Sequence, residues 1–252
     1  MHGIDFGGYT EWKRPLYSPK PIEFVICGVA WGKNKNTTYD INLPEIRKEK
    51  RLMTYGFYNG THEWLAQAEA WLRLSRDAGS KAIWMDWERS STSVLDDNPQ
   101  GHALRAKSII NFLQNEFDGK IGIYSNFNDY VVYLQPHVVE ARDWPWWVAW
   151  PDESFDTPPG NTTWWGNINR ERNDYIVDQY SWKGYGPDYG ATNDKKSMDL
   201  NVVNPAINLD VWLGIEEEPG YTTPEMEYTR GWNDAIDRIQ SDAEEARRKS
   251  PT

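Results

Sequence analysis

Sulfur ligands and long apolar runs are scarce in this chain. Its 252 residues include a single cysteine, Cys27, which excludes an internal disulfide framework and a zinc site built from cysteines. No run approaches the roughly 18 apolar residues that span a membrane, so we expect no membrane insertion. The opening residues, "MHGIDFGGYTEW", lack the basic and apolar segments of a secretory signal. We therefore expect a protein that is made in the cytoplasm without a signal peptide.

Positive charge is also in short supply. The chain has 27 lysines and arginines against 38 aspartates and glutamates, and its formal net charge at pH 7 is −11. No block of basic residues stands out. Because an acidic surface repels phosphate backbones, we expect no nucleic-acid partner.

Aromatic residues are abundant by contrast, with 15 tryptophans and 14 tyrosines. Many lie beside glycine, asparagine, aspartate or proline, as in "WPWWVAWPDES" and "NTTWWGN". One interpretation is that large rings simply fill the core. The other is carbohydrate binding, because flat rings with polar edges suit the faces of sugars.

Short apolar runs alternate with helical patterns along most of the chain. Strands are expected at residues 3–6, 22–31, 52–58, 82–88, 121–125, 146–150, 175–181 and 198–203. Helices are expected from Thr61 to Gly79, from Pro99 (after an Asn98 cap) to near Gly119, and over 127–141. This alternation predicts right-handed βαβ units and a mainly parallel sheet. We therefore expect an α/β fold, an irregular (β/α) TIM-like barrel of about eight strands, over residues 1–213.

The C-terminal part has a different pattern. Residues 214–222, "GIEEEPGYT", are expected to be a linker, and residues 223–252 a single helix with one apolar stripe. One hypothesis is that this helix packs back on the barrel. The alternative is self-association or docking to a particle through the stripe.

Two carboxylates end one of the predicted strands, in "KAIWMDWERS". Residues two apart on a strand share a face, so Asp86 and Glu88 should point the same way at the end of the strand where β/α barrels carry their chemistry. Two carboxyl groups so close cannot both ionise cheaply, and one pKa should rise. Acid-catalysed glycoside cleavage needs such a pair, one protonated and one ionised.

Two further acids favour a functional site over a solvated strand end. Asp5 ends the first predicted strand and Asp199 lies on the last, and these strands are neighbours in a closed barrel. A divalent metal is the rival explanation for four converging carboxyl groups. The groups around them are mostly aromatic, so we expect no metal.

In their order along the chain, these motifs resemble glycoside hydrolase family 25, the Chalaropsis-type lysozymes. The matching segments are "GIDF", "YGFY", "MDWE", "IYSN", "WVAW", "DQYS" and "MDLN", over about residues 3–205. Each motif is weak alone, and the ordered set is fairly specific. The resemblance implies an irregular β/α barrel that needs no cofactor and cleaves the β-1,4 bond between N-acetylmuramic acid and N-acetylglucosamine in bacterial peptidoglycan.

The resemblance also implies roles for individual residues. Glu88 would be the general acid, Asp86 would stabilise the transition state or orient the acetamido group, and Asp5 and Asp199 would hold and tune that pair. The residues expected to line the sugar cleft are Tyr58, Trp87, Tyr124, Trp150, Gln179 and Tyr180. The sequence departs from the family at Gly7, at "AWGKN" after the second strand, and in an aromatic segment at 155–173.

Three functional hypotheses follow from these residues. The first is a peptidoglycan muramidase, for which a phage endolysin released by a holin, or a lysin carried on the virion, would fit the missing signal. The second is a chitinase-like hydrolase, which would need acids where this chain has Lys81 and Trp84. The third is a non-catalytic glycan-binding module, for example in a phage tail.

Overall fold

The computed structural model describes residues 1–18, 21–149, 175–193 and 197–216. Residues 1–215 form one compact unit. Trp150, the aromatic segment 155–173 and the helix expected at 223–252 lie outside the described residues, as does most of the expected linker. The predictions for them therefore remain predictions.

Eight strands close into a barrel. They are β1 (His2–Phe6), β2 (Phe24–Trp31), β4 (Leu52–Phe57), β5 (Ala82–Asp86), β6 (Lys120–Asn126), β7 (Trp146–Ala149), β8 (Tyr175–Tyr185) and β9 (Ser197–Val203). Each pairs with the next in this order, and β1 pairs with both β2 and β9 to close the ring. β9 runs antiparallel to both of its neighbours, whereas the other pairs around the ring are parallel. A short β3 (Asn34–Lys35) folds back on the end of β2. The expected irregular barrel is confirmed.

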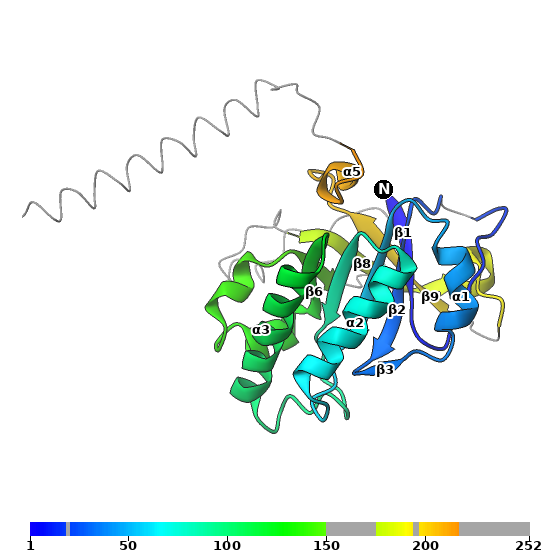
Figure 1. The fold of residues 1–252 in the computed structure, drawn as a ribbon. Helices are drawn as coiled ribbons and strands as arrows, with labels where there is room; N and C mark the ends of the chain where they lie inside the picture. Colours follow the sequence, from blue (N-terminus) through cyan, green and yellow to red (C-terminus); the bar gives the residue numbers. More distant parts are fainter. Residues whose placement is uncertain (19–20, 150–174, 194–196, 217–252) are drawn as a thin grey trace, which may run out of the picture. The chain divides into compact units, whose positions relative to one another are not determined.

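Helices cover the outside of part of the barrel: α1 (Tyr39–Ile46), α2 (Trp64–Ala78) and α3 (Pro99–Glu116). Figure 1 shows α2 and α3 beside the strands that they connect. The expected cap of α3 is present, since the Asn98 side chain accepts a hydrogen bond from the Gly101 N–H. The expected stop of α2 is present too, with Gly79 at φ 75°.

Two helix predictions need correction. α2 begins at Trp64 and not at Thr61, because the Asn59 side chain accepts hydrogen bonds from Thr61 and holds residues 59–62 in a turn. Over 127–141 there is no single helix, only a short α4 (Phe127–Asp129), a π-helical turn η1 (Tyr130–Leu134) and a 3-10 turn η2 (Val139–Asp143). Pro136 explains why the helix does not continue, because proline has no N–H to donate, and the backbone is extended at Val138 before η2 begins.

Strand alternation divides the core into an inner and an outer part. One buried cluster includes Phe24, Ile26, Met53, Trp84 and Trp147, which alternate along their strands and fill the barrel interior. A second cluster, with Ile83 and Met85 from β5 and Trp87 just after it, packs against α2 and α3. Inner and outer residues on β5 therefore alternate strictly, and Asp86 falls on the inner side.

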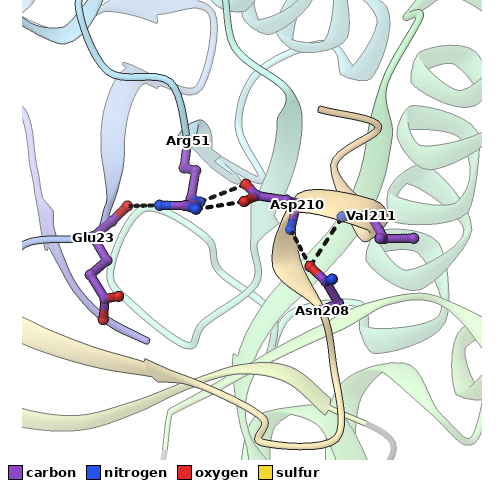
Figure 2. A network of polar contacts seen from close by, with 5 residues as sticks. All are labelled: Glu23, Arg51, Asn208, Asp210 and Val211. Carbon is purple, nitrogen blue, oxygen red and sulfur yellow. Dashed lines mark hydrogen bonds and ion pairs between the residues drawn. The ribbon is translucent and has the colours of Figure 1, made fainter. Parts of the chain in front are cut away.

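A short helix, α5 (Leu209–Trp212), closes the end of the barrel where the parallel strands begin. Trp212 stacks on Trp84 of the interior, with 5.6 Å between ring centroids. Figure 2 shows how α5 is held: the Arg51 guanidinium donates to both carboxylate oxygens of Asp210, at 2.6 and 2.5 Å, and to the Glu23 carbonyl. The Asn208 side chain caps α5 by accepting from the N–H groups of Asp210 and Val211. This bidentate pair ties the segment after β9 to the loops before β2 and β4.

We expect Arg51→Met to lower the free energy of unfolding by about 2 kcal/mol, because it leaves the buried Asp210 carboxylate without its main counter-charge. Urea denaturation followed by circular dichroism measures this change. The matched control is Arg47→Met, which removes the exposed pair with Asp77 and should cost less than about 1 kcal/mol. Equal losses in the two variants would contradict the assigned importance of the Arg51 pair.

Candidate active site

The structure brings the four predicted acids together in one hollow of about 330 Å³, here called the acid pocket. Asp5 comes from β1, Asp86 from the end of β5, Glu88 from two residues beyond it, and Asp199 from β9. Aromatic and polar side chains complete its walls: Trp31, Tyr55, Phe57, Ser90, Tyr124, Trp147 and Gln179. The pocket therefore combines four carboxyl groups with flat apolar surfaces.

Asp5 is held by amide donors at the bottom of the pocket. Its Oδ2 accepts hydrogen bonds from Gln179 Nε2 at 3.0 Å and from Asn201 Nδ2 at 2.7 Å. Tyr124 and Trp147 fix these two amides, by donating to Gln179 Oε1 and Asn201 Oδ1. Burial raises the pKa of Asp5 to about 6 against the opposing effect of these amides.

Asp199 lies directly opposite Asp5 in the antiparallel pairing of β1 with β9. The two carboxyl groups hydrogen bond to each other. The hydrogen bond with Asp199 opposes the effect of burial on the pKa of Asp5.

Asp86 is the most isolated of the four acids. It is buried, and its Oδ1 has no hydrogen-bond partner among the residues that the structure describes. Burial raises its pKa well above the ordinary range, and the charges of Glu88, Asp5 and Asp199 raise it further. A buried carboxyl oxygen that lines a pocket without a protein partner is suited to bind a polar group of a ligand.

Glu88 has the properties of a proton donor near neutral pH. Burial raises the pKa of its carboxyl to about 7, and the negative charge of Asp129 contributes in the same direction. Hydrogen bonds with the Tyr124 and Asn126 side chains oppose this rise. A large fraction of Glu88 is therefore protonated at pH 7 and below.

Asp129, at the end of α4, is a component that the sequence interpretation missed. Its Oδ2 accepts from the Arg89 N–H at 2.7 Å and from Asn126 Nδ2 at 2.8 Å. In return its own N–H donates to Asn126 Oδ1, which fixes the orientation of the amide that contacts Glu88. The sequence contains a signal for this residue in "NFND". Asn126 caps a helical turn there, and its side chain accepts a hydrogen bond from the N–H of Asp129, three residues later.

We expect Asp129→Asn to lower the pKa of Glu88 by about half a unit to one unit, because it removes a buried negative charge nearby. Carboxyl titration by NMR with labelled glutamate measures the shift. Asp143→Asn, on the exposed surface, serves as the control and should leave the titration unchanged. An unchanged Glu88 pKa in Asp129→Asn would remove Asp129 from this role.

The predicted sugar-contacting residues divide into two groups. Tyr124 and Gln179 line the acid pocket as expected. Tyr58, Trp87 and Tyr180 do not line it, and this expectation was wrong. The Tyr58 hydroxyl hydrogen bonds to His102 Nδ1 at 2.8 Å, and its ring packs on Trp87 in the outer core.

Strand alternation explains this error. On β4 the inward residues are Tyr55 and Phe57, so the next residue, Tyr58, points outward. Trp87 lies between two inward acids and points outward for the same reason. Tyr180 follows the inward Gln179 and packs with Ile4 and Phe6 of β1. Alternation along each strand from the inward residues Phe57, Asp86 and Gln179 predicts these three orientations.

Comparison with solved structures shows which known proteins share this fold. No family model and no curated protein matches the sequence. Among solved structures, the bacterial lysozyme from Streptomyces coelicolor superposes with a TM-score of 0.62 at 16% identity, over 86% of this chain and 98% of that one. The chain has the fold of the family 25 lysozymes.

Two further structures carry the same fold. A family GH25 lysozyme from Aspergillus fumigatus has a TM-score of 0.59 at 14% identity, over 81% of this chain and 93% of that one. The catalytic domain of endolysin ply40 from bacteriophage P40 of Listeria monocytogenes has a TM-score of 0.57 at 14% identity, with coverages of 85% and 97%. The resemblance seen in the ordered motifs thus extends to the three-dimensional arrangement of the strands that hold the acids.

The described part of the chain lacks two kinds of feature. Within it, no group of three or more His, Cys, Asp or Glu side chains is arranged to hold a metal ion. None of the helices described has the length and apolarity that crossing a membrane requires.

Proposed function

We propose that this protein is a peptidoglycan hydrolase of the lysozyme type. It cleaves the β-1,4 bond between N-acetylmuramic acid and N-acetylglucosamine. The observation that carries the proposal is Glu88, a largely buried carboxyl with a pKa near 7 beside a second acid in an aromatic-walled pocket. The shared fold with family 25 lysozymes and muramidases supports it.

In this reaction Glu88 gives its proton to the glycosidic oxygen as the bond to the sugar's anomeric carbon breaks. The cleaved sugar then carries developing positive charge at that carbon. Asp86, whose Oδ1 has no hydrogen-bond partner among the described residues, stabilises this sugar, by its charge or by binding its acetamido group. Water completes the hydrolysis: its hydroxyl ends on the anomeric carbon, and its remaining proton returns to the Glu88 carboxylate.

Asp5 on β1 and Asp199 on β9 influence the pair formed by Asp86 and Glu88. They share one hydrogen bond, and their charge raises the pKa of Asp86. Tyr124 hydrogen bonds to both Glu88 and Gln179, and so couples the proton donor to the network around Asp5. We also propose that the protein reaches the cell wall as a phage lysin, released by a holin or carried on the virion. The fold shared with a Listeria phage endolysin supports this route.

We expect Glu88→Gln to abolish cleavage, with a rate loss of at least about a thousandfold, because the amide has no proton to give. Purified peptidoglycan is incubated with the protein, reduced with borohydride and examined by mass spectrometry. Wild-type protein should yield reduced N-acetylmuramic acid ends, and Glu88→Gln none. Glu69→Gln, on the exposed face of α2, should behave as wild type.

Other products would separate the alternatives. Reduced N-acetylglucosamine ends would mean that the opposite bond is cut. Sedimentation with the sacculi without any cleavage by wild-type protein would indicate a binding module. Substantial activity in Glu88→Gln would remove Glu88 from the role of proton donor.

We expect the rate of cleavage to fall as the pH rises through about 7, because the proton donor Glu88 is then lost. A general acid must be protonated to act, so activity is retained at pH values below the pKa of Glu88 and falls above it. A pH profile of kcat with a soluble glycan substrate measures this limb. In Asp129→Asn the limb should move to lower pH. A flat profile from pH 4 to 8 would contradict the assignment.

A further inference from the structure

The outer side of the strand end that carries two of the acids packs against a buried histidine. Trp87 lies between Asp86 and Glu88 and is fully buried. Its ring contacts the ring of Tyr58, with 4.9 Å between centroids. The Tyr58 N–H donates to the Asp86 carbonyl at 3.0 Å, and the Tyr58 hydroxyl hydrogen bonds to His102 Nδ1 on α3. The backbone that holds both acids is therefore supported, through Tyr58, by His102.

His102 also contacts the loop that follows Glu88, residues 89–97. A hydrogen bond joins its ring to the Val94 backbone, and because Nδ1 faces Tyr58, this contact uses the other ring nitrogen. The Val94 N–H donates to the Ser90 carbonyl at 3.2 Å, and Ser90 lines the acid pocket. One imidazole thus joins the strand end that carries the acids to the loop that leaves them. The residues of this contact chain, here called the His102 link, are Trp87, Tyr58, His102 and Val94.

The loop has a conformation that its surroundings must hold in place. Val94 has a φ of 47°, and no other non-glycine residue in the described part of the chain has a positive φ. This conformation is strained for a β-branched residue. The loop also packs closely on Gly60, where a Cβ would lie 2.1 Å from the Ser93 carbonyl oxygen and 2.7 Å from His102 Cε1. Contacts with His102 and Gly60 therefore keep the loop in its strained form.

The hydrogen-bond network assigns a neutral form to His102. The Tyr58 oxygen accepts from the Arg105 side chain, so the one hydroxyl proton of Tyr58 points to His102 Nδ1. An Nδ1 that accepts carries no proton, and the proton of the neutral ring is then on the nitrogen that contacts Val94. A protonated Nδ1 would present a second donor to the Tyr58 hydroxyl and a second positive charge beside Arg105. Protonation of His102 is therefore incompatible with the link as it stands.

Three titratable or charged side chains face His102: Tyr58 just after β4, Asp97 in the loop and Arg105 on α3. Burial lowers the pKa of His102 below its ordinary value of 6.5, and the Arg105 charge acts in the same direction. Asp97 and the Val94 backbone oppose this effect. Burial raises the pKa of Tyr58 to about 12, so that hydroxyl stays uncharged in this range. His102 is therefore neutral at pH 7 and takes up a proton in acid.

We propose that neutral His102 is a positioning residue for Asp86 and Glu88, and that its protonation releases them. The neutral ring fixes Tyr58 and Val94, and through them the strand end and the loop beyond it. When the ring takes up a proton, both contacts weaken and the two acids lose their fixed positions. This inference rests on the proposed function, because the acids need fixed positions only if they act on a bound sugar. It assigns the acidic limb of the pH profile to a histidine outside the pocket, whereas Glu88 sets the alkaline limb.

The first test is the pH profile of kcat on a soluble glycan substrate in wild-type protein and His102→Gln. A glutamine amide can accept from Tyr58 and donate to Val94, but it does not titrate. We expect the wild-type kcat to fall by about tenfold or more in acid, below the ordinary histidine pKa of about 6.5. His102→Gln should keep most of the wild-type kcat at pH 6.5 and lose this acidic fall. An unchanged acidic limb in His102→Gln would overturn the proposal, because the pocket carboxyl groups would then set it.

His137→Gln is the matched control, since His137 is exposed and lies outside the link. Its profile should equal that of wild type at both limbs. Loss of the acidic limb in this variant as well would overturn the assignment to His102.

Tyr58→Phe tests the link from its other end. The variant keeps the ring on Trp87 and removes the hydroxyl that stabilises neutral His102. We expect kcat at pH 6.5 to fall about tenfold with KM within about twofold, because the acids and not the sugar-binding walls lose their positions. The acidic limb should also move to higher pH, since His102 then takes up a proton more easily. Lower stability with an unmoved acidic limb would indicate a structural role alone and overturn the proposal. Tyr17→Phe, at an exposed tyrosine, is the control.

Hydrogen exchange tests the link without cleavage. The N–H groups of Arg89 and Val94 donate to Asp129 and to the Ser90 carbonyl, so their protection factors measure how firmly the loop is held. NMR on labelled histidine gives the titration midpoint of His102. We expect protection to be about tenfold lower below this midpoint in wild-type protein and to be unchanged in His102→Gln.

This measurement separates failure of the link from failure of the proposed function. Equal protection above and below the midpoint would overturn the link even in a protein that cleaves peptidoglycan. If wild-type protein cleaves no glycan, the proposed function fails, and hydrogen exchange alone decides whether His102 holds the loop.

Discussion

The pairing of β1 with β9 is the constraint on which the site depends. β9 runs against its neighbours, and the register sets Asp199 directly opposite Asp5. Asp5 is buried and Asp199 is half-buried, and the charges of both raise the pKa of Asp86 across the barrel. Had the register of β9 been shifted by one residue, Asp199 would face the outer core, and the charge balance of the pocket would differ.

Collecting four acids in a mostly apolar barrel has a cost in stability, and the fold offsets it in two ways. Amide donors from Gln179 and Asn201 stabilise the charged form of Asp5, and Tyr124 and Trp147 hold those amides in place. At the other end, α5 and its bidentate pair with Arg51 close the barrel far from the chemistry. The stabilising contacts of α5 thus lie at the end where the strands begin. The unfavourable clustering of negative charge lies at the end where the strands finish.

Most of the fold and the four acids could be predicted from the sequence, because both depend on local periodicity. Apolar runs mark the strands, and Asp86 and Glu88 follow from their spacing of two. The helix expected at 127–141 failed because Pro136 interrupts it. Tyr58, Trp87 and Tyr180 were misplaced because their motifs, not their strand positions, suggested a cleft. Asp129 and Trp31 were missed because their value comes from neighbours distant in sequence, Glu88 and Phe57.

The site has a direction that follows from the order of its strands. Glu88 and the groups that tune its proton lie toward β6, whereas the open aromatic surface lies toward β2 and β3. The carboxyl group with a pKa near 7 and the open aromatic surface therefore lie on opposite sides of Asp86. A substitution toward β6 can change the pKa of Glu88 without touching Trp31, and a substitution toward β2 can change the aromatic surface without touching Glu88 or Asp129. The two properties of the site can therefore vary independently on the same barrel.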